Sequence, residues 1–533
     1  MNKNYPYNSQ RTSVYAKNGM VATAQPSASQ VGLDILKKGG NAVDAAIAVA
    51  ACLTVVEPTS NGIGGDNFAL IWMKDRLYGL NSSGQSPDSL SIDSLKQKGI
   101  SQIPKYGFIP VTVPGAVSGW VAMHKRFGKL PFTDVLLPAI LYARNGFAVS
   151  PTVAHYWSIA HKIYQKNLQG DEFKYWFDTF TKNDKTPQEG ELFTLNDHAK
   201  TLEEIAYTYG ESFYRGNLAD QIDAYSRKFG GYIRKSDLES FQSEWVDPIS
   251  SNYKGYDVWE IPPNGQGAIA LMALNIMENF KINKKESIKT YHQSIEAMKL
   301  AFADGLEYIS DPKTMKVEVK DLLSKDYAKS RSKLLDQTAS LPSCGKPAGS
   351  GTVYLATADS DGNMVSMIQS NYMGFGSGLV VPNTGIALHN RGHNFSMNPN
   401  SDNYLQPNKR PYHTIIPGFL TKDSIPLGPF GVMGGFMQPQ GHMQVIMNLI
   451  DFKMNPQSAL DAPRWQWIEG KKITVEPEFS KRIINGLIKK GHDIIINPDL
   501  GSFGRGEIIL RDPINHVYQG GTEKRADGTI SAY

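Results

Sequence analysis

The sequence predicts a mixed α/β protein, and three observations support this fold class. Apolar residues recur at helical spacing through much of the first two-thirds of the chain, and they alternate at strand spacing after residue 352. Between these two parts, residues 335–350 are rich in Ser, Pro and Gly, a composition typical of a linker. The 533 residues are 41% hydrophobic and 20% charged, as in ordinary globular proteins.

Two helices are expected near the start of the chain. The first covers residues 28–38 and ends at the stop signal Gly39-Gly40. The second is rich in alanine, begins at Asn41 or Asp44 and runs towards Val55. Its length and composition are typical of a buried helix, because a membrane span needs about 18–20 apolar residues.

The next segments alternate between loops and regular elements. Residues 57–66 are rich in glycine and predict a tight loop that leads into a strand over 68–73. The alternating residues before Pro114-Gly115 predict the end of another strand, which a helix over 116–127 follows. Residues 130–330 predict mostly helices.

The region after the linker predicts a β-hairpin. Strands over 353–358 and 364–370 flank the turn segment 359–363, Asp-Ser-Asp-Gly-Asn. More strands are expected after it, with helices over 442–449 and 480–490.

Composition and charge exclude several functional classes. The net charge is only +4, and no cluster of Lys and Arg with interleaved aromatic residues suggests nucleic-acid binding. No apolar run is long enough to cross a membrane, and the first residues lack the apolar core of a secretory signal. We therefore expect a cytoplasmic protein with no membrane partner. The 2 cysteines are too few for a disulfide framework or a cysteine-based metal site.

Thr352 stands directly after Gly349-Ser-Gly351 and opens the first strand of the predicted hairpin. A threonine hydroxyl is a weak nucleophile at neutral pH, and an N-terminal threonine can use its own α-amine as the activating base. An internal threonine gains this amine only when the bond after Gly351 is broken. The small Gly351 leaves room for the hydroxyl to attack that carbonyl. By itself, however, a Gly-Thr pair at a strand start is common and structural.

Short motifs in a particular order give Thr352 a context. They are Gly19–Pro26, Gly39–Ala46, Val56–Pro58, Gly62–Asp66, Val113–Gly115, Gly119-Trp120, Ala301–Asp304, Asp311-Pro312, Asp361–Asn363, Asn408–Pro411, Met433–Gly435 and Asp461–Arg464. Each motif is weak alone, but their order and spacing closely resemble the γ-glutamyltransferase family over nearly the whole chain.

The resemblance implies a four-layer αββα fold of the N-terminal-nucleophile hydrolase type. Members of the family are made as precursors that cleave themselves before a threonine nine residues upstream of the Asp in Asp-Gly-Asn. Counting back from Asp361 gives Thr352. The resemblance therefore implies cleavage between Gly351 and Thr352. The large region 1–351 and the small region 352–533 would then be partners in one intertwined unit.

The resemblance also implies the catalytic groups. Ser370, eighteen positions after the nucleophile, corresponds to a hydroxyl residue that hydrogen-bonds the threonine Oγ. Gly434 and Gly435 correspond to a glycine pair whose backbone N–H groups form an oxyanion hole. This chemistry needs no metal and no organic cofactor.

The expected substrate-binding positions depart from the best-known members. Ser83 stands where an arginine would bind the substrate α-carboxylate, and Asn394 stands where an acid would bind the α-amine. His413-Thr414 replaces a pair of serines, and Tyr372 replaces an asparagine. We expect these positions to bind a substrate whose recognition differs from that of a γ-glutamyl zwitterion.

Two nearby arginines and two histidines have competing interpretations. Arg391 and Arg410 are candidate carboxylate partners in place of the missing arginine, and a structural ion pair is equally expected for each. His389 and His393 have the i,i+4 spacing of a zinc motif, but the residues between them are poor helix formers, so we expect no metal site.

The leading functional hypothesis is a self-processing amidohydrolase that cleaves γ-glutamyl amides such as glutathione, with weak transfer to amine acceptors. The segment between Phe395 and Lys409 is too short for the lid of some members, which favours water as the acceptor. One alternative is an acylase for glutaryl-type or poly-γ-glutamyl substrates. Another is an unprocessed, inactive scaffold, against which the intact catalytic motifs argue. The oligomeric state stays open, and a homo-oligomer is compatible with the sequence.

Overall fold

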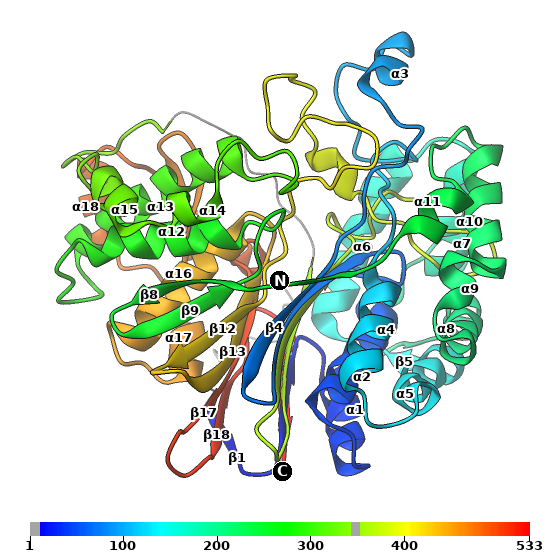
Figure 1. The fold of residues 1–533 in the computed structure, drawn as a ribbon, viewed down its shortest axis with the longest axis horizontal. Helices are drawn as coiled ribbons and strands as arrows, with labels where there is room; N and C mark the ends of the chain where they lie inside the picture. The colour runs from blue at the N-terminus through cyan, green and yellow to red at the C-terminus, as the bar shows by residue number, and fades with distance from the viewer. Residues whose placement is uncertain (1–10, 343–351) are drawn as a thin grey trace.

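The fold has four layers: two seven-stranded sheets lie face to face between two layers of helices (Figure 1). The structure is a computed structural model that describes residues 11–342 and 352–533. The αββα prediction is confirmed. Gly351 and the second half of the predicted linker, residues 343–350, lie outside the described residues.

The nucleophile candidate Thr352 directly precedes β10, an interior strand of the sheet whose order is β19-β2-β10-β11-β3-β4-β7. All neighbouring strands in this sheet are antiparallel. Its strands are β2 (Met20–Thr23), β3 (Asp66–Met73), β4 (Arg76–Ser82), β7 (Glu244–Val246), β10 (Val353–Ala358), β11 (Met364–Ser370) and β19 (Thr529–Ala532). We call it the nucleophile sheet. It combines strands from both sides of residue 352.

The second sheet, the glycine-pair sheet, has the order β1-β18-β17-β13-β12-β9-β8 and is also antiparallel. Its strands are β1 (Val14–Ala16), β8 (Ile249–Tyr253), β9 (Tyr256–Glu260), β12 (Gly418–Lys422), β13 (Ile425–Met433), β17 (Arg505–Arg511) and β18 (Tyr518–Gly521). Smaller sheets are formed by β5 (Phe147–Ala148) with β6 (Leu192–Phe193), and by β14 (Trp465–Glu469), β15 (Lys472–Val475) and β16 (Asp493–Ile496).

One helical layer covers the outer face of the nucleophile sheet, on the right in Figure 1. It contains α1 (Pro26–Lys37), α2 (Ala42–Val56), α4 (Ala116–Phe127), α5 (Phe132–Asn145), α6 (Pro151–Asn167), α7 (Lys174–Phe180), α8 (Asn196–Thr208), α9 (Glu211–Tyr214), α10 (Asn217–Lys228) and α11 (Lys235–Ser240). The short helix α3 (Ile92–Gln97) packs in a small separate cluster.

The other layer covers the glycine-pair sheet, on the left in Figure 1. It contains α12 (Gly267–Glu278), α13 (Ile288–Tyr308), α14 (Val319–Leu322), α15 (Lys325–Ser332), α16 (Met437–Ile450), α17 (Pro456–Asp461) and α18 (Lys481–Lys489). Three 3₁₀ turns complete the described elements: η1 (Asp171–Phe173), η2 (Arg391–Asn394) and η3 (Leu500–Phe503). No helix in the described ranges is long and apolar enough to cross a membrane.

Local sequence explains how the Ala-rich helix α2 forms. Asn41 is its N-cap and accepts from the backbone N–H groups of Val43 and Asp44, while Asp44 accepts from the N–H of Asn41. Asn41 and Asp44, the two residues proposed as the start of this helix, thus form one reciprocal capping box. Every residue of α2 is buried, which suits a helix with small apolar side chains on all faces.

One local prediction was wrong. Residues 111–115 form no strand, because their N–H groups bond to loop carbonyls: Val113 donates to Gln85 at 2.9 Å, and Gly115 to Gly65 at 2.9 Å. Residues 130–330 are mostly helical, as predicted, and also contain the hairpin β8–β9. The hairpin β10–β11 has the predicted bounds, and α16 begins at Met437 rather than at His442.

Candidate active site

The hairpin register brings two hydroxyl groups together. Val353 pairs with Gln369, so the preceding Thr352 lies opposite Ser370. The Thr352 Oγ1 and Ser370 Oγ atoms are 3.0 Å apart, and both residues are fully buried. The distance is within hydrogen-bond range. The structure thus places the two predicted catalytic hydroxyls in contact.

Tyr372 lies two residues after Ser370 and has an unusual backbone. Its φ of 74° lies in the left-handed region, and its N–H donates to Ser370 Oγ at 2.8 Å. Its hydroxyl donates to Asn394 Oδ1 at 2.5 Å, and Asn394 Nδ2 donates to the Tyr412 carbonyl. Burial raises the pKa of Tyr372 to about 12, so its hydroxyl remains protonated. The Asn394 amide is therefore engaged by protein groups on both sides.

Gly434 and Gly435 form the turn between β13 and α16. Their φ values of 132° and 60° belong to a backbone that side chains disfavour. Their carbonyls accept from Met437 N and Gln438 N at the start of α16. Strand β13 faces β10 across the two sheets: a Cβ on Gly431 would lie 2.3 Å from the ring of Tyr354. The end of β13 thus lies near the start of β10.

Gln266, just before α12, connects the glycine pair to the predicted binding residues. Its Nε2 donates to the carbonyls of Thr414, at 2.6 Å, and Gly435, at 2.8 Å. Its Oε1 accepts from the Tyr412 hydroxyl at 2.8 Å. One buried amide therefore fixes the segment 412–414 against the glycine turn. Its place in the sequence carried no signal of this role.

Asp66 is the buried acid at the centre of the site. Its Oδ2 lies 2.9 Å from His413 Nε2 and 3.1 Å from His389 Nδ1. Burial acts to raise the pKa of Asp66, but the two histidines hold it below its usual range, so the carboxylate is ionised. Burial, together with the nearby Arg391 guanidinium, lowers the pKa of His413 to about 3, so His413 is neutral. Asp66 lies in the quoted motif Gly62–Asp66, yet its partners come from distant segments.

Arg391 is fully buried beside this acid. Its Nη1 donates to Thr414 Oγ1 at 2.7 Å, and its guanidinium carbon lies 4.4 Å from the centre of the Tyr372 ring. Its Nε is 3.7 Å from Asp66 Oδ2, and Nε and Nη2 have no hydrogen-bond partner in the described protein. Burial lowers the pKa of Arg391 to about 10, so it is charged at neutral pH.

Ser83 and Arg410 belong to a neighbouring network. The Ser83 hydroxyl donates to Asn81 Oδ1 at 2.7 Å, and the Ser83 carbonyl accepts from Arg410 Nε at 2.9 Å. Arg410 also pairs with Glu244 at 2.8 Å. Arg410 therefore forms a structural ion pair, which is one of the two roles expected for it from the sequence. The hydroxyl and the carbonyl of Ser83 are thus both engaged within the protein. Substrate binding by Ser83 remains a prediction.

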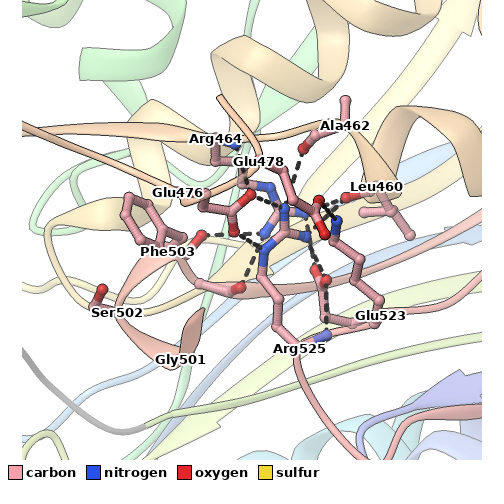
Figure 2. A network of polar contacts seen from close by, with 12 residues as sticks. Leu460, Ala462, Arg464, Glu476, Glu478, Gly501, Ser502, Phe503, Glu523 and Arg525 are labelled. Atoms are coloured by element: carbon pink, nitrogen blue, oxygen red, sulfur yellow. Dashed lines mark hydrogen bonds and ion pairs between the residues drawn. The ribbon is translucent and has the colours of Figure 1, made fainter. Parts of the chain in front are cut away.

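Figure 2 shows a buried network of charged side chains that includes Arg464, Glu476, Glu523 and Arg525. Arg464 pairs with Glu523 at 2.8 Å and donates to the carbonyls of Phe503, at 3.1 Å, and Gly504, at 2.9 Å. Gly504 packs directly against the turn, since a Cβ on Gly434 would lie 3.1 Å from Gly504 Cα. Arg525, which pairs with Glu523 and Glu476, completes the network. Arg464 thus holds in place the segment that touches the turn.

The histidines considered for zinc face different partners. His389 contacts Asp66, and His393 Nδ1 lies 2.7 Å from the Ile103 carbonyl. Within 11–342 and 352–533, the potential metal ligands His292, Glu296 and His492 do lie close together. However, Lys299 Nζ is 2.6 Å from Glu296 Oε1, so an internal cation already neutralises that carboxylate. The expectation of no metal stays a prediction.

Comparison with known proteins identifies the family of this chain. The family described as Gamma-glutamyltranspeptidase matches residues 28–533. The chain is 38% identical to the Glutathione hydrolase-like YwrD proenzyme of Bacillus subtilis, covering 97% of this chain and 98% of that protein. It is 32% identical to the Glutathione hydrolase proenzyme of Escherichia coli, covering 98% and 93%.

The fold is also similar to solved structures. The cephalosporin acylase from Bacillus halodurans superposes with a TM-score of 0.98 at 58% identity, covering 100% of this chain and 99% of that one. The family is one of enzymes that includes hydrolases, transpeptidases and acylases. The match over most of the sequence, the four-layer fold and the paired hydroxyls agree, and the chain belongs to the γ-glutamyltranspeptidase family.

Proposed function

We propose that this chain is a self-processing amidohydrolase that uses Thr352 as its nucleophile. The observation that carries the proposal is the 3.0 Å contact between the buried hydroxyls of Thr352 and Ser370 at the start of β10. After cleavage of the bond to Gly351, the new α-amine of Thr352 would serve as the base. Ser370 would orient the attacking oxygen.

The glycine turn would supply the electrophilic half of the mechanism. Attack on an amide carbonyl creates a negative oxygen, and the N–H groups of Gly434 and Gly435 would stabilise it. The amine product then leaves, and water releases the acyl group from Thr352. No step of this chemistry requires a metal or an organic cofactor.

The sheet order supports processing without dissociation. Strand β10 lies between β2 and β11, and β9 pairs with β12, so each sheet joins strands from both sides of residue 352. The regions 1–351 and 352–533 would remain one body after the cut. Ladder hydrogen bonds, and hydrophobic clusters that contain residues of both regions, would hold them together.

Two measurements test the proposal: the fragments seen on a denaturing gel and the turnover of an amide substrate. The wild-type protein should give two bands on a denaturing gel, with a new N-terminus at Thr352, and should hydrolyse γ-glutamyl p-nitroanilide. Thr352→Ala should give one band and no turnover, while Thr352→Ser, which keeps a hydroxyl, should still be cleaved. Turnover by Thr352→Ala would show that the proposed mechanism is wrong.

The substrate proposed first is a γ-glutamyl amide such as glutathione, with hydrolysis faster than transfer. Adding a dipeptide acceptor should change the rate of glutathione breakdown little. Strong stimulation would contradict the preference for water.

An acylase acting on other acyl amides is the second candidate. It is favoured by the engaged amide of Asn394 at the position expected to bind an α-amine, and by the 58% identity to a protein described as a cephalosporin acylase.

A further inference from the structure

Helix α5 (Phe132–Asn145) is apolar on two opposite sides. One side packs in the hydrophobic core beneath the outer helical layer, through the buried residues Val135, Leu136, Ala139, Ile140 and Ala143. On the other side, Leu137 and Leu141 lie one helical turn apart and are 44% and 43% exposed. A helix that is apolar on all sides is normally covered on all sides. The outer side of α5 is therefore suited to packing against a further surface.

A groove of about 370 Å³ lies beside the two exposed leucines. It runs between α5 and α1, at the lower right of Figure 1, and Val31 and Ile35 of α1 line it together with Leu137 and Leu141. This surface therefore combines protruding apolar side chains with a hollow that apolar side chains can enter. A surface that carries both features can be complementary to a second copy of itself.

Charged residues flank the leucines on the same face of α5. Asp134 stands three positions before Leu137, and Arg144 three positions after Leu141, so the four side chains form one row along the helix. Asp134 pairs with Lys38 at 2.9 Å, and Arg144 pairs with Glu203 of α8 at 2.7 Å. These four charged side chains are between 38% and 50% exposed. Exposed ion pairs are weak, so each of these charges can take a further partner.

We propose that this face binds a second copy of the chain, with the two α5 helices packed antiparallel about a two-fold axis. An axis midway between Leu137 and Leu141 sets each of them against the other in the second copy. The same axis sets Asp134 against Arg144 of the second copy, at both ends of the contact. Lys38 and Asp134 of one copy, followed by Arg144 and Glu203 of the other, then alternate in sign.

The order of charges along the row decides both the direction of packing and the occupant. Parallel packing would set Asp134 against Asp134 and Arg144 against Arg144, which like-charge repulsion disfavours. The row acid, leucine, leucine, base is complementary to itself only when it is reversed, which a two-fold axis across the helix provides. The leucines would supply most of the binding free energy, while the charges fix direction and register.

The first experiment measures the mass of the processed full-length protein by analytical ultracentrifugation over a series of concentrations. We expect a dimer of the processed protein, and we expect Leu141→Glu to raise its dissociation constant roughly tenfold or more, because a carboxylate would enter an apolar contact. Ile163→Glu is the matched control: Ile163 is 42% exposed but lies on α6, and this variant should keep the wild-type dissociation constant.

Two outcomes of this experiment would overturn the proposal. A wild-type protein that is monomeric at every concentration would exclude the second copy and leave the face to a different protein partner. An equal loss of dimer in Leu141→Glu and Ile163→Glu would show that the contact does not lie on α5.

The second experiment tests the register with two charge-reversed variants. Asp134→Arg alone sets arginine against Arg144 at both ends of the contact, and Arg144→Asp alone sets aspartate against Asp134. Each variant by itself should therefore be monomeric where the wild-type protein is dimeric. An equimolar mixture should form a heterodimer, because opposite charges then meet at both ends. Recovery on mixing requires both variants to be folded, so misfolding cannot produce it. A mixture that stays monomeric, or single variants as dimeric as the wild type, would overturn the antiparallel register.

Discussion

Replacing Arg464 with methionine should weaken both the fold and the catalytic turn. The side chain is 2% exposed, and its replacement removes the 2.8 Å ion pair to Glu523 and the bonds to the carbonyls of Phe503 and Gly504. Breaking a buried pair by removing one partner typically costs about 3–5 kcal/mol. Glu523 keeps Arg525 and the N–H of Gly506, so we expect a loss of about 3 kcal/mol in unfolding free energy.

Activity should fall as well, because Gly504 packs against Gly434. Losing one oxyanion donor costs about 10²–10³ in rate, so a turn displaced by the loose segment should lower kcat about tenfold. The assays are urea denaturation and turnover of γ-glutamyl p-nitroanilide, both on processed protein. Wild-type kcat in Arg464→Met would refute the link between the charge network and the turn.

Arg525→Met is the matched control for this prediction. Arg525 is a second buried arginine of the same network, paired with Glu476 and Glu523, and it donates to the carbonyls of Leu460 and Ala462. It should destabilise the protein by a similar amount while lowering kcat less. An equal loss of kcat in both variants would mean that general destabilisation explains the effect.

Two further predictions concern stability. Asn41→Ala should lower the unfolding free energy by about 0.5–2 kcal/mol in urea denaturation, since it removes the N-cap of α2; an unchanged midpoint would contradict the capping role. Burial acts to raise the pKa of Glu523, but Arg464 and Arg525 lower it to about 2, below the unfolded value of about 4.3. The contribution of ionised Glu523 to the free energy of unfolding should be complete above about pH 5 and should decline as the pH falls towards 2. In Glu523→Gln, the free energy of unfolding should therefore fall less steeply between about pH 5 and pH 2 than in the wild-type protein.

Local pattern was sufficient for the elements that carry the nucleophile. The strands flanking Asp359–Asn363 were predicted with the bounds that the structure shows, and a hairpin with these bounds can pair Thr352 with Ser370. The glycine pair was implied by the resemblance to the family, through the motif Met433–Gly435. Wrong predictions arose where extended segments, such as 111–115, bond to loops instead of strands. Periodicity reports which side of a segment is buried but not what it bonds to.

The sequence by itself determined the mixed α/β class and the bounds of the hairpin, because these depend on local periodicity. Its motifs implied, through the resemblance to the family, that Ser370 contacts Thr352. Only the tertiary structure decided which acid lies beside each of two arginines. Arg391 and Arg410 look alike in the sequence, but Glu244 pairs with Arg410, while Asp66 is shared between two histidines beside Arg391. These partners come from segments far apart in the chain, and only the order of strands in the sheets brings them together.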